Sequence, residues 1–288
     1  MKINSTPIVF NLATTGAVLF GSAIISGQFA PSASAFSLGD NGEITIYQNA
    51  SDNPEGKSDL GRHFWVDFSG SVSRQSLDGL SSLALFRVDG FQTVNGITTV
   101  NLNAKLFAGV DAFGNPLPNS DRFENYRASV LGFAVDPNVK QGSASVNGDF
   151  NTIAYKGITA NGGIDTEICF KGGGSTNNCN GAASGGVELG NSGEFNISFA
   201  LANPSNQFTL SNFGVRYQDI NSNVYGLQGA SGTGVGEAVP EPLTILGTAM
   251  ALGFGGLFQR EFSKKQKSTK AGLVTPTIQL LLIMGRRI

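Results

Sequence analysis

Apolar and polar residues alternate one by one over much of the chain, and this period of two constrains the fold more than any other feature. The segment EFNISFAL is the clearest example, because every second residue from Phe195 to Leu201 is apolar. The same alternation recurs in HFWVDFSG, SLALFRV, TVNLNAKLF, IDTEICF and FGVRYQD. Such alternation is typical of strands buried on one face, whereas a helix would show a period of about 3.6.

Turn-forming clusters separate the alternating segments, and no segment has the pattern of a long helix. The clusters lie at residues 52–56, 147–149, 161–163 and 203–206. About eight to ten strands with one apolar face each predict two packed antiparallel sheets. We therefore expect residues 36–225 to form an all-β domain, an antiparallel β-sandwich of the jelly-roll type. Phe is abundant in the chain and would supply most of the packing between the sheets.

Glycine is the most over-represented residue. The chain has 39 Gly in 288 residues, about twice the usual share of ~7%. Residues 226–238 read GLQGASGTGVGEA, a composition typical of flexible linkers. We therefore expect this segment to connect the β domain to the C-terminal region.

The N-terminus has the three parts of a secretory signal peptide. One Lys precedes an uncharged run over residues 8–29, and Ala33 and Ala35 then form the A-x-A pattern that signal peptidase accepts. Residues 1–35 are therefore predicted to be a signal helix, cleaved after Ala35, on an exported chain. A membrane anchor that stays attached and a buried helix are the alternatives.

The C-terminal region has an uncharged run over residues 243–258, followed by a cluster of positive charges. Sixteen residues of helix span about 24 Å, which is short of the ~30 Å hydrocarbon core of a bilayer. An apolar run with a basic flank nevertheless predicts a transmembrane helix whose basic end faces the cytoplasm. The flanking basic residues are Arg260, Lys264, Lys265 and Lys267.

The order of a Pro-Glu-Pro tripeptide, an apolar helix and a basic cluster over residues 239–270 resembles the PEP-CTERM sorting domain, in its cyanobacterial form. The resemblance implies that Pro240, Glu241 and Pro242 are recognised by an exosortase, a membrane-embedded cysteine transpeptidase. It also implies that the helix holds the chain in the inner membrane during sorting, while the basic cluster stops transfer. An ordinary single-pass anchor with a proline-rich stalk is the alternative.

Residues 271–288 depart from this pattern, because tails of this type normally stop soon after the basic cluster. The apolar piece at 278–284 is too short to span a bilayer. The extension has no functional interpretation, and a genuine extension and an error in the gene model are both open.

Two cysteines, Cys169 and Cys179, lie ten residues apart. An exported chain enters an oxidising compartment, where an isolated even pair of cysteines usually closes. We therefore predict a structural disulfide between them. With one His and two Cys in the whole chain, neither a Cys₄ nor a Cys₂His₂ zinc site can form within it.

Charge is unevenly distributed along the chain. Residues 36–238 contain 11 Lys and Arg against 19 Asp and Glu, a formal charge of −8, which the basic tail hides in the whole-chain value of −2. A nucleic-acid surface normally needs a basic face, so a nucleic-acid partner is not expected. An acidic domain suits a soluble, exported protein.

No residue pattern points to catalysis or a cofactor. His63 is the only imidazole, it adjoins a predicted strand start, and the chain has no G-x-S-x-G motif. Paired carboxylates of a secreted hydrolase stay open, because the fold decides which acids meet. Loop-bound calcium is a further possibility at Asp40 to Glu43 or at Asp111 to Asp121, with solvated turns as the alternative.

These observations favour a surface or matrix protein without enzymatic activity, processed by signal peptidase and then by an exosortase. Its expected location is the inner membrane during sorting, and then the cell surface or the exterior. The main alternative is a carbohydrate-binding module for exopolysaccharide, with exposed aromatics beside a groove. Aromatics on strands also serve as core, so both roles are open for Trp65, Tyr47, Tyr126, Tyr155, Tyr217 and Tyr225.

Overall fold

The computed structural model describes four stretches of the chain, and their regular structure is β apart from one short 3₁₀ turn. The described stretches are residues 36–159, 163–174, 177–181 and 185–239. The predicted signal helix, sorting tail and extension lie outside them. Within these stretches, no helix is long and apolar enough to cross a membrane.

Some neighbouring strands are joined by tight turns, and others by loops of more than ten residues. In chain order, the elements are Ser37–Leu38 (β1), Ile44–Tyr47 (β2), His63–Val72 (β3), Gln75–Val94 (β4), Ile97–Ala108 (β5), Ser120–Arg122 (the 3₁₀ turn η1), Asn125–Asp136 (β6), Ser145–Gly148 (β7), Thr152–Ala154 (β8), Ile168–Lys171 (β9), Val187–Glu188 (β10), Ser192–Ala200 (β11), Gln207–Ser222 (β12) and Leu227–Val239 (β13).

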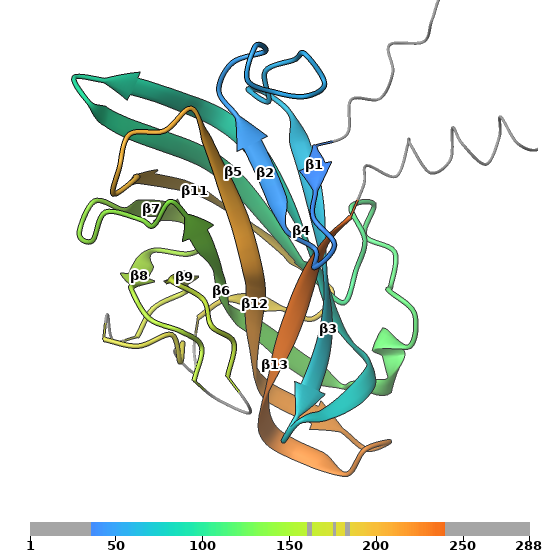
Figure 1. The fold of residues 1–288 in the computed structure, drawn as a ribbon. Helices are drawn as coiled ribbons and strands as arrows, with labels where there is room; N and C mark the ends of the chain where they lie inside the picture. Colours follow the sequence, from blue (N-terminus) through green and yellow to red (C-terminus); the bar gives the residue numbers. More distant parts are fainter. Residues whose placement is uncertain (1–35, 160–162, 175–176, 182–184, 240–288) are drawn as a thin grey trace, which may run out of the picture. The chain divides into compact units, whose positions relative to one another are not determined.

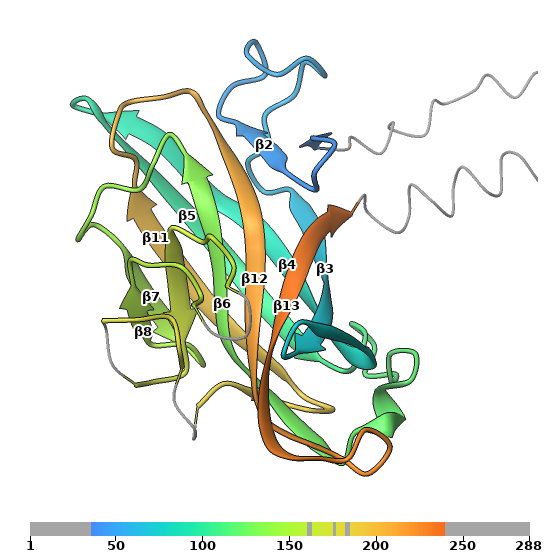
Figure 2. The same cartoon turned by 60° about the horizontal axis from the view of Figure 1, so that its bottom comes forward.

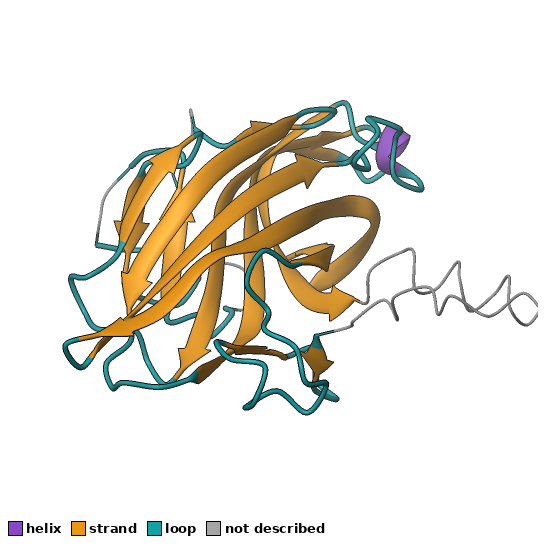
Figure 3. Cartoon of the chain, turned by 90° about the horizontal axis from the view of Figure 1, so that it is seen from above, coloured by secondary structure: helices purple, strands orange, loops and turns teal. Residues whose placement is uncertain are grey.

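All thirteen strands belong to one antiparallel sheet (Figure 1). Its order is β7-β11-β5-β4-β3-β13-β12-β6-β9-β8, with β2 on β12, β1 on β2 and β10 on β6. Seen from above, the strands curve around the core so that the sheet nearly closes on itself (Figure 3). The two ends of the order, β7 and β8, are joined by residues 149–151. The predicted all-β, antiparallel architecture is confirmed.

The prediction of two separate sheets was wrong, because strand β13 connects the strands into one sheet. Residues 226–238, expected to be a flexible linker, contribute all but one residue to this strand. One edge of β13 pairs with β3, from Thr233 opposite Ser71 to Val239 opposite Trp65, and the other edge pairs with β12. Figures 1 and 2 show β13 lying between β3 and β12. It therefore joins two sets of strands into one sheet.

The glycines of β13 are required by close packing. A Cβ atom on Gly236 would lie 2.4 Å from a ring carbon of Phe68 and 2.8 Å from the Cβ of Phe213. A Cβ atom on Gly234 would lie 2.9 Å from a ring carbon of Tyr217. The inner face of the strand thus presents bare backbone to aromatic rings. A glycine in a strand often marks such an approach.

Phenylalanine rings fill the concave side of the sheet, as the alternation predicted. Phe64 stacks on Phe86 with ring centroids 4.9 Å apart, and Phe86 lies 6.0 Å from Phe213 and 6.1 Å from Phe133. All four rings are at most 1% exposed. They come from β3, β4, β6 and β12, so the core crosses the junction at β13. Aromatic pairs at these distances add to the stabilisation from burial.

One predicted strand is shorter than its pattern. The alternation in IDTEICF begins at Ile164, but β9 begins only at Ile168. Ile164 instead makes an isolated bridge with Ile158 in the preceding loop. The apolar residue is used to close a loop, which a period of two cannot distinguish from a strand.

We expect Gly236→Ala to lower the free energy of unfolding by about 1–3 kcal/mol, the usual range for adding a methyl group to a packed site. Denaturant unfolding would measure it. Val235→Thr is the matched control, because Val235 is 60% exposed on the other face of the same strand, and it should change stability by no more than about 0.5 kcal/mol. Equal stability of Gly236→Ala and the native chain would contradict the close approach.

Candidate binding face

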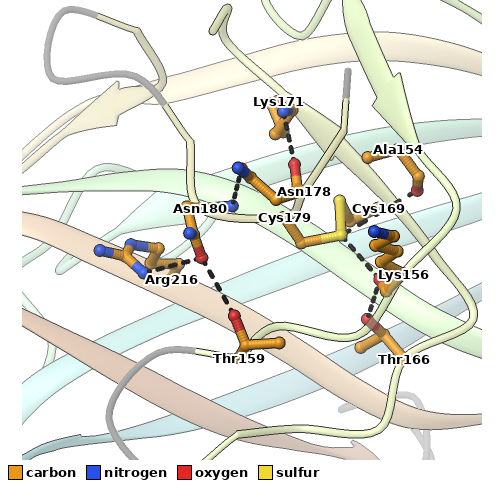
Figure 4. Close-up of a disulfide and its surroundings, with 10 residues drawn as sticks. All are labelled: Ala154, Lys156, Thr159, Thr166, Cys169, Lys171, Asn178, Cys179, Asn180 and Arg216. Atoms are coloured by element: carbon orange, nitrogen blue, oxygen red, sulfur yellow. Dashed lines mark hydrogen bonds between the residues drawn. A yellow bond between two sulfur atoms is a disulfide. The ribbon is translucent and has the colours of Figure 1, made fainter. Parts of the chain in front are cut away.

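The predicted disulfide is confirmed. Cys169 in β9 and Cys179 in the following loop are bonded, and both are fully buried (Figure 4). Cys169 lies opposite Gly132 of β6 and Ala154 of β8. The bond therefore fastens the loop after β9 to the end of the sheet.

Two cations support that loop. Lys171 is fully buried and its Nζ donates a hydrogen bond to the carbonyl oxygen of Asn178 at 2.6 Å. Arg216 of β12 donates to Oδ1 of Asn180 at 3.3 Å (Figure 4). Burial lowers the pKa of both Lys171 and Arg216. These partners are loop carbonyl and amide oxygens, which indicates a structural role for this region.

Asp111, the first residue of one loop considered for calcium, uses its carboxylate within the loop. Oδ1 of Asp111 accepts the backbone N–H groups of Phe113 at 2.8 Å and Asn115 at 2.9 Å, and Oδ2 accepts the Asn115 amide at 2.9 Å. These bonds, that of the Asn115 side chain first, lower the pKa of Asp111. Among the described residues, no group of three or more His, Cys, Asp or Glu side chains is arranged to hold a metal. Calcium binding stays a prediction.

The aromatic residues considered for sugar stacking do not share one surface. Tyr126 and Tyr217 are fully buried with ring centroids 5.4 Å apart. Their hydroxyl groups bond inside the fold, that of Tyr126 donating to the Ser81 carbonyl at 2.6 Å and that of Tyr217 lying 2.8 Å from Oγ of Ser82. Burial raises the pKa of both tyrosines. Trp65 differs, because it lies half-buried on the convex side of β3.

The convex side of β3, β4, β5, β11 and β7, here called the outer face, has a continuous row of polar side chains. The strand register places each residue of this row directly opposite the next, across five strands. With strands about 4.8 Å apart, the row extends over about 19 Å. This polar row consists of His63, Arg87, Asn103, Asn196 and Asn147.

Hydrogen bonds fix the middle of the polar row. The amide nitrogen of Asn103 donates to Oε1 of Glu194 at 2.9 Å and to Oδ1 of Asn196 at 3.0 Å. Arg87 forms a two-pronged ion pair with Asp89, in which Nη2 donates to Oδ2 at 3.1 Å. The hydrogen bond to Asp89 raises the pKa of Arg87. These contacts restrict the side chains that face solvent.

Two hollows lie on the outer face, on either side of Trp65 along the strands. The polar hollow has a volume of about 310 Å³, and the acidic hollow has a volume of about 320 Å³. The polar hollow is lined by Asp89, Asn101, Ser145, Asn147, Asn196 and Ser198, among others. The acidic hollow is lined by Asp67, Ser69, Ser76, Asp78, Ser81 and Leu83, among others.

Like charges meet at one edge of the acidic hollow. Asp67 of β3 lies directly opposite Glu237 of β13 in the strand register. Desolvation, together with the charge of Glu237, raises the pKa of Asp67 above the usual value of an aspartate. No ion pair to either carboxylate occurs within the part of the chain that the structure describes.

The residues of the predicted sorting tail lie outside the described residues. These are the sorting motif Pro240, Glu241 and Pro242 and the basic cluster Arg260, Lys264, Lys265 and Lys267. No family model, curated protein or solved structure matches the chain. The interpretation of the outer face rests on its geometry.

Apart from His63, the sequence did not single out the polar row. His63 is exposed at the first position of β3, as a strand-end histidine should be. The sequence did indicate a polar face, because polar residues such as Asn101, Asn103 and Lys105 in β5 alternate with apolar ones. Alternation shows that these side chains share a face, but their partners on other strands depend on the register.

Labelling of free thiols in the non-reduced, exported protein should find none, because the chain has two cysteines and the bond uses both. Closing a loop of about ten residues should stabilise the fold by about 2.5–3 kcal/mol. The double variant Cys169→Ser with Cys179→Ser should lose that amount in denaturant unfolding. Two labelled thiols in the native protein would contradict the assignment.

Asp67→Asn should raise the free energy of unfolding at neutral pH. Because the pKa of Asp67 is raised in the folded chain, folded-state stability falls as the pH rises from the ordinary aspartate pKa to the raised one. Asparagine removes that loss, and the difference should disappear below the ordinary pKa. Urea unfolding across a pH series would measure it, with Asp40→Asn in an exposed loop as control. An equal gain at every pH would contradict this explanation.

Proposed function

We propose that the chain is an exported surface or matrix protein without enzymatic activity, sorted through residues 239–270 by an exosortase. The observation that carries the proposal is where the sheet begins and ends. Strand β1 begins at Ser37, two residues after the predicted cleavage at Ala35. Val239, the last described residue of β13, directly precedes Pro240 in the sequence. Cleavage after Ala35 and loss of the tail from Pro240 onward would leave every strand of the domain in place.

The disulfide and the charge of the domain support export. A buried bond between the only two cysteines suits an oxidising compartment. The formal charge of −8 over residues 36–238 suits solubility outside the cell. Neither property depends on a ligand or a catalytic group.

The surroundings of the candidate catalytic groups support a role without catalysis. Asp78 in the acidic hollow pairs with Arg122 at 2.9 Å, and its two carboxylate oxygens accept the Asn119 amide at 3.1 and 3.0 Å. These partners engage both carboxylate oxygens of Asp78 within the fold. A hydrolase of the two-carboxylate type would need two carboxylates available to one substrate, whereas the Asp78 carboxylate is engaged by Arg122 and Asn119.

Expression with and without an exosortase tests the sorting. The mass of the surface product should show loss of the C-terminal tail only in the presence of the enzyme, and Glu241→Ala should abolish that loss. Gln228→Ala, which removes an exposed amide within β13, is the control and should be processed normally. An intact C-terminus in both backgrounds would refute the proposal.

A second candidate function is carbohydrate binding, which the outer face favours. Amide and hydroxyl side chains along one surface provide donors and acceptors for sugar hydroxyl groups. The polar row and the two hollows place such groups beside Trp65.

A further inference from the structure

We propose that the outer face binds one extended chain of an uncharged polysaccharide, which would run along β4 from the polar hollow, past Trp65, to the acidic hollow. This inference deepens the carbohydrate-binding candidate. The inference rests on the proposed export in one respect, because export would place the outer face where the polysaccharide is. Binding is a property of the folded chain and is measured separately from sorting.

The length of the face suits a polymer. Asp89 of β4 lines the polar hollow, and Ser81 of the same strand lines the acidic hollow. Eight residues of strand separate them, which is about 26 Å. Leu83, Leu85 and Arg87 lie between them and alternate with buried residues, so they face the same side. A ligand reaching both hollows must therefore be several sugar units long.

Side-chain amides on the outer face would supply the hydrogen bonds to the sugar hydroxyl groups. The Asn103 amide donates to Oδ1 of Asn196, and within the described part of the chain the Asn196 amide nitrogen donates no hydrogen bond, so it can donate to a ligand. Asn101 and Asn147 line the polar hollow, and their side chains make no hydrogen bond within the described residues. An amide offers donors and an acceptor together, which matches the hydroxyl groups of a sugar. The fixed position of Asn196 lowers the entropy lost when a ligand binds.

The apolar part of the face lies next to the polar row. Trp65 lies opposite Leu85 of β4, and its ring centroid is 5.9 Å from that of Phe107 in β5. The ammonium group of Lys105 lies 5.3 Å from the Phe107 centroid. Phe107 is itself buried, so it supports Trp65 from the side. A half-buried, supported indole ring with one face toward solvent can pack against the C–H face of a sugar.

The charges favour an uncharged ligand over an acidic one. Arg87 is paired with Asp89, and Arg122 at the acidic hollow is paired with Asp78. Lys105 lies opposite Glu194 in the strand register. Asp67 and Glu237, by contrast, have no cationic partner among the ion pairs of the described residues. A polyanion would meet net negative charge, which disfavours its approach.

Affinity electrophoresis of the purified full-length chain tests the proposal. The gels contain cellulose derivatives without charge, mixed-linkage glucan, mannan or xylan as uncharged probes, and alginate as the acidic probe. At least one uncharged polysaccharide should retard the chain, and alginate should not. Trp65→Ala and the double variant Asn147→Ala with Asn196→Ala should each weaken apparent affinity about tenfold, which corresponds to about 1.4 kcal/mol.

Gln228→Ala is the matched control, because it removes an exposed amide from the β12–β13 hairpin and should leave affinity unchanged. The melting temperature of each variant shows whether it is folded, and the asparagine variants, which change exposed residues, keep the test valid if Trp65→Ala unfolds. Retardation by none of the uncharged probes, stronger retardation by alginate, or native affinity in the folded asparagine variants would overturn the proposal. None of these outcomes alters the mass of the sorted product.

Discussion

The sheet depends on how closely the backbone of β13 approaches the aromatic rings beside it. Gly234 and Gly236 leave room for Tyr217, Phe68 and Phe213, where a single methyl group would overlap a ring or its attached carbon. The strand can then pair with β3 on one edge and β12 on the other. Without it, β3 and β12 have no strand between them that pairs with both. The close approach of the β13 backbone to these rings therefore supports both the packing of the aromatic core and the continuity of the sheet.

The sequence predicted those parts of the fold that depend on neighbours along the chain. Phe195, Ile197 and Phe199 are all buried on one face of β11, as their alternation indicated. Strand β13 was missed because glycine and serine are typical of linkers, and the need for glycine at Gly236 arises from Phe68, far away in the sequence. The expectation of two separate sheets was wrong for the same reason.

Some parts of the candidate site could likewise be predicted from the sequence, and others could not. The disulfide could be predicted because it needs only two cysteines and an oxidising compartment. The polar row could not, because His63 and Asn147 belong to strands that come together only through three others. Residue type also could not show that Trp65 lies on the surface of the sheet whereas Tyr217 lies in the core. Both are aromatic with a polar group, but Ser82 provides Tyr217 with a hydrogen-bond partner inside the core.

The junction strand is also the last strand of the domain to leave the ribosome. Trp65 pairs with Val239, so this contact joins opposite ends of the domain sequence. Pairings between distant segments form slowly, because a large loop must close first. A partly synthesised chain can form the earlier hairpins, but it still lacks the strand that pairs with both β3 and β12. The sheet therefore reaches its full strand pairing only when residue 239 is available, so completion of that pairing coincides with the appearance of the C-terminal region.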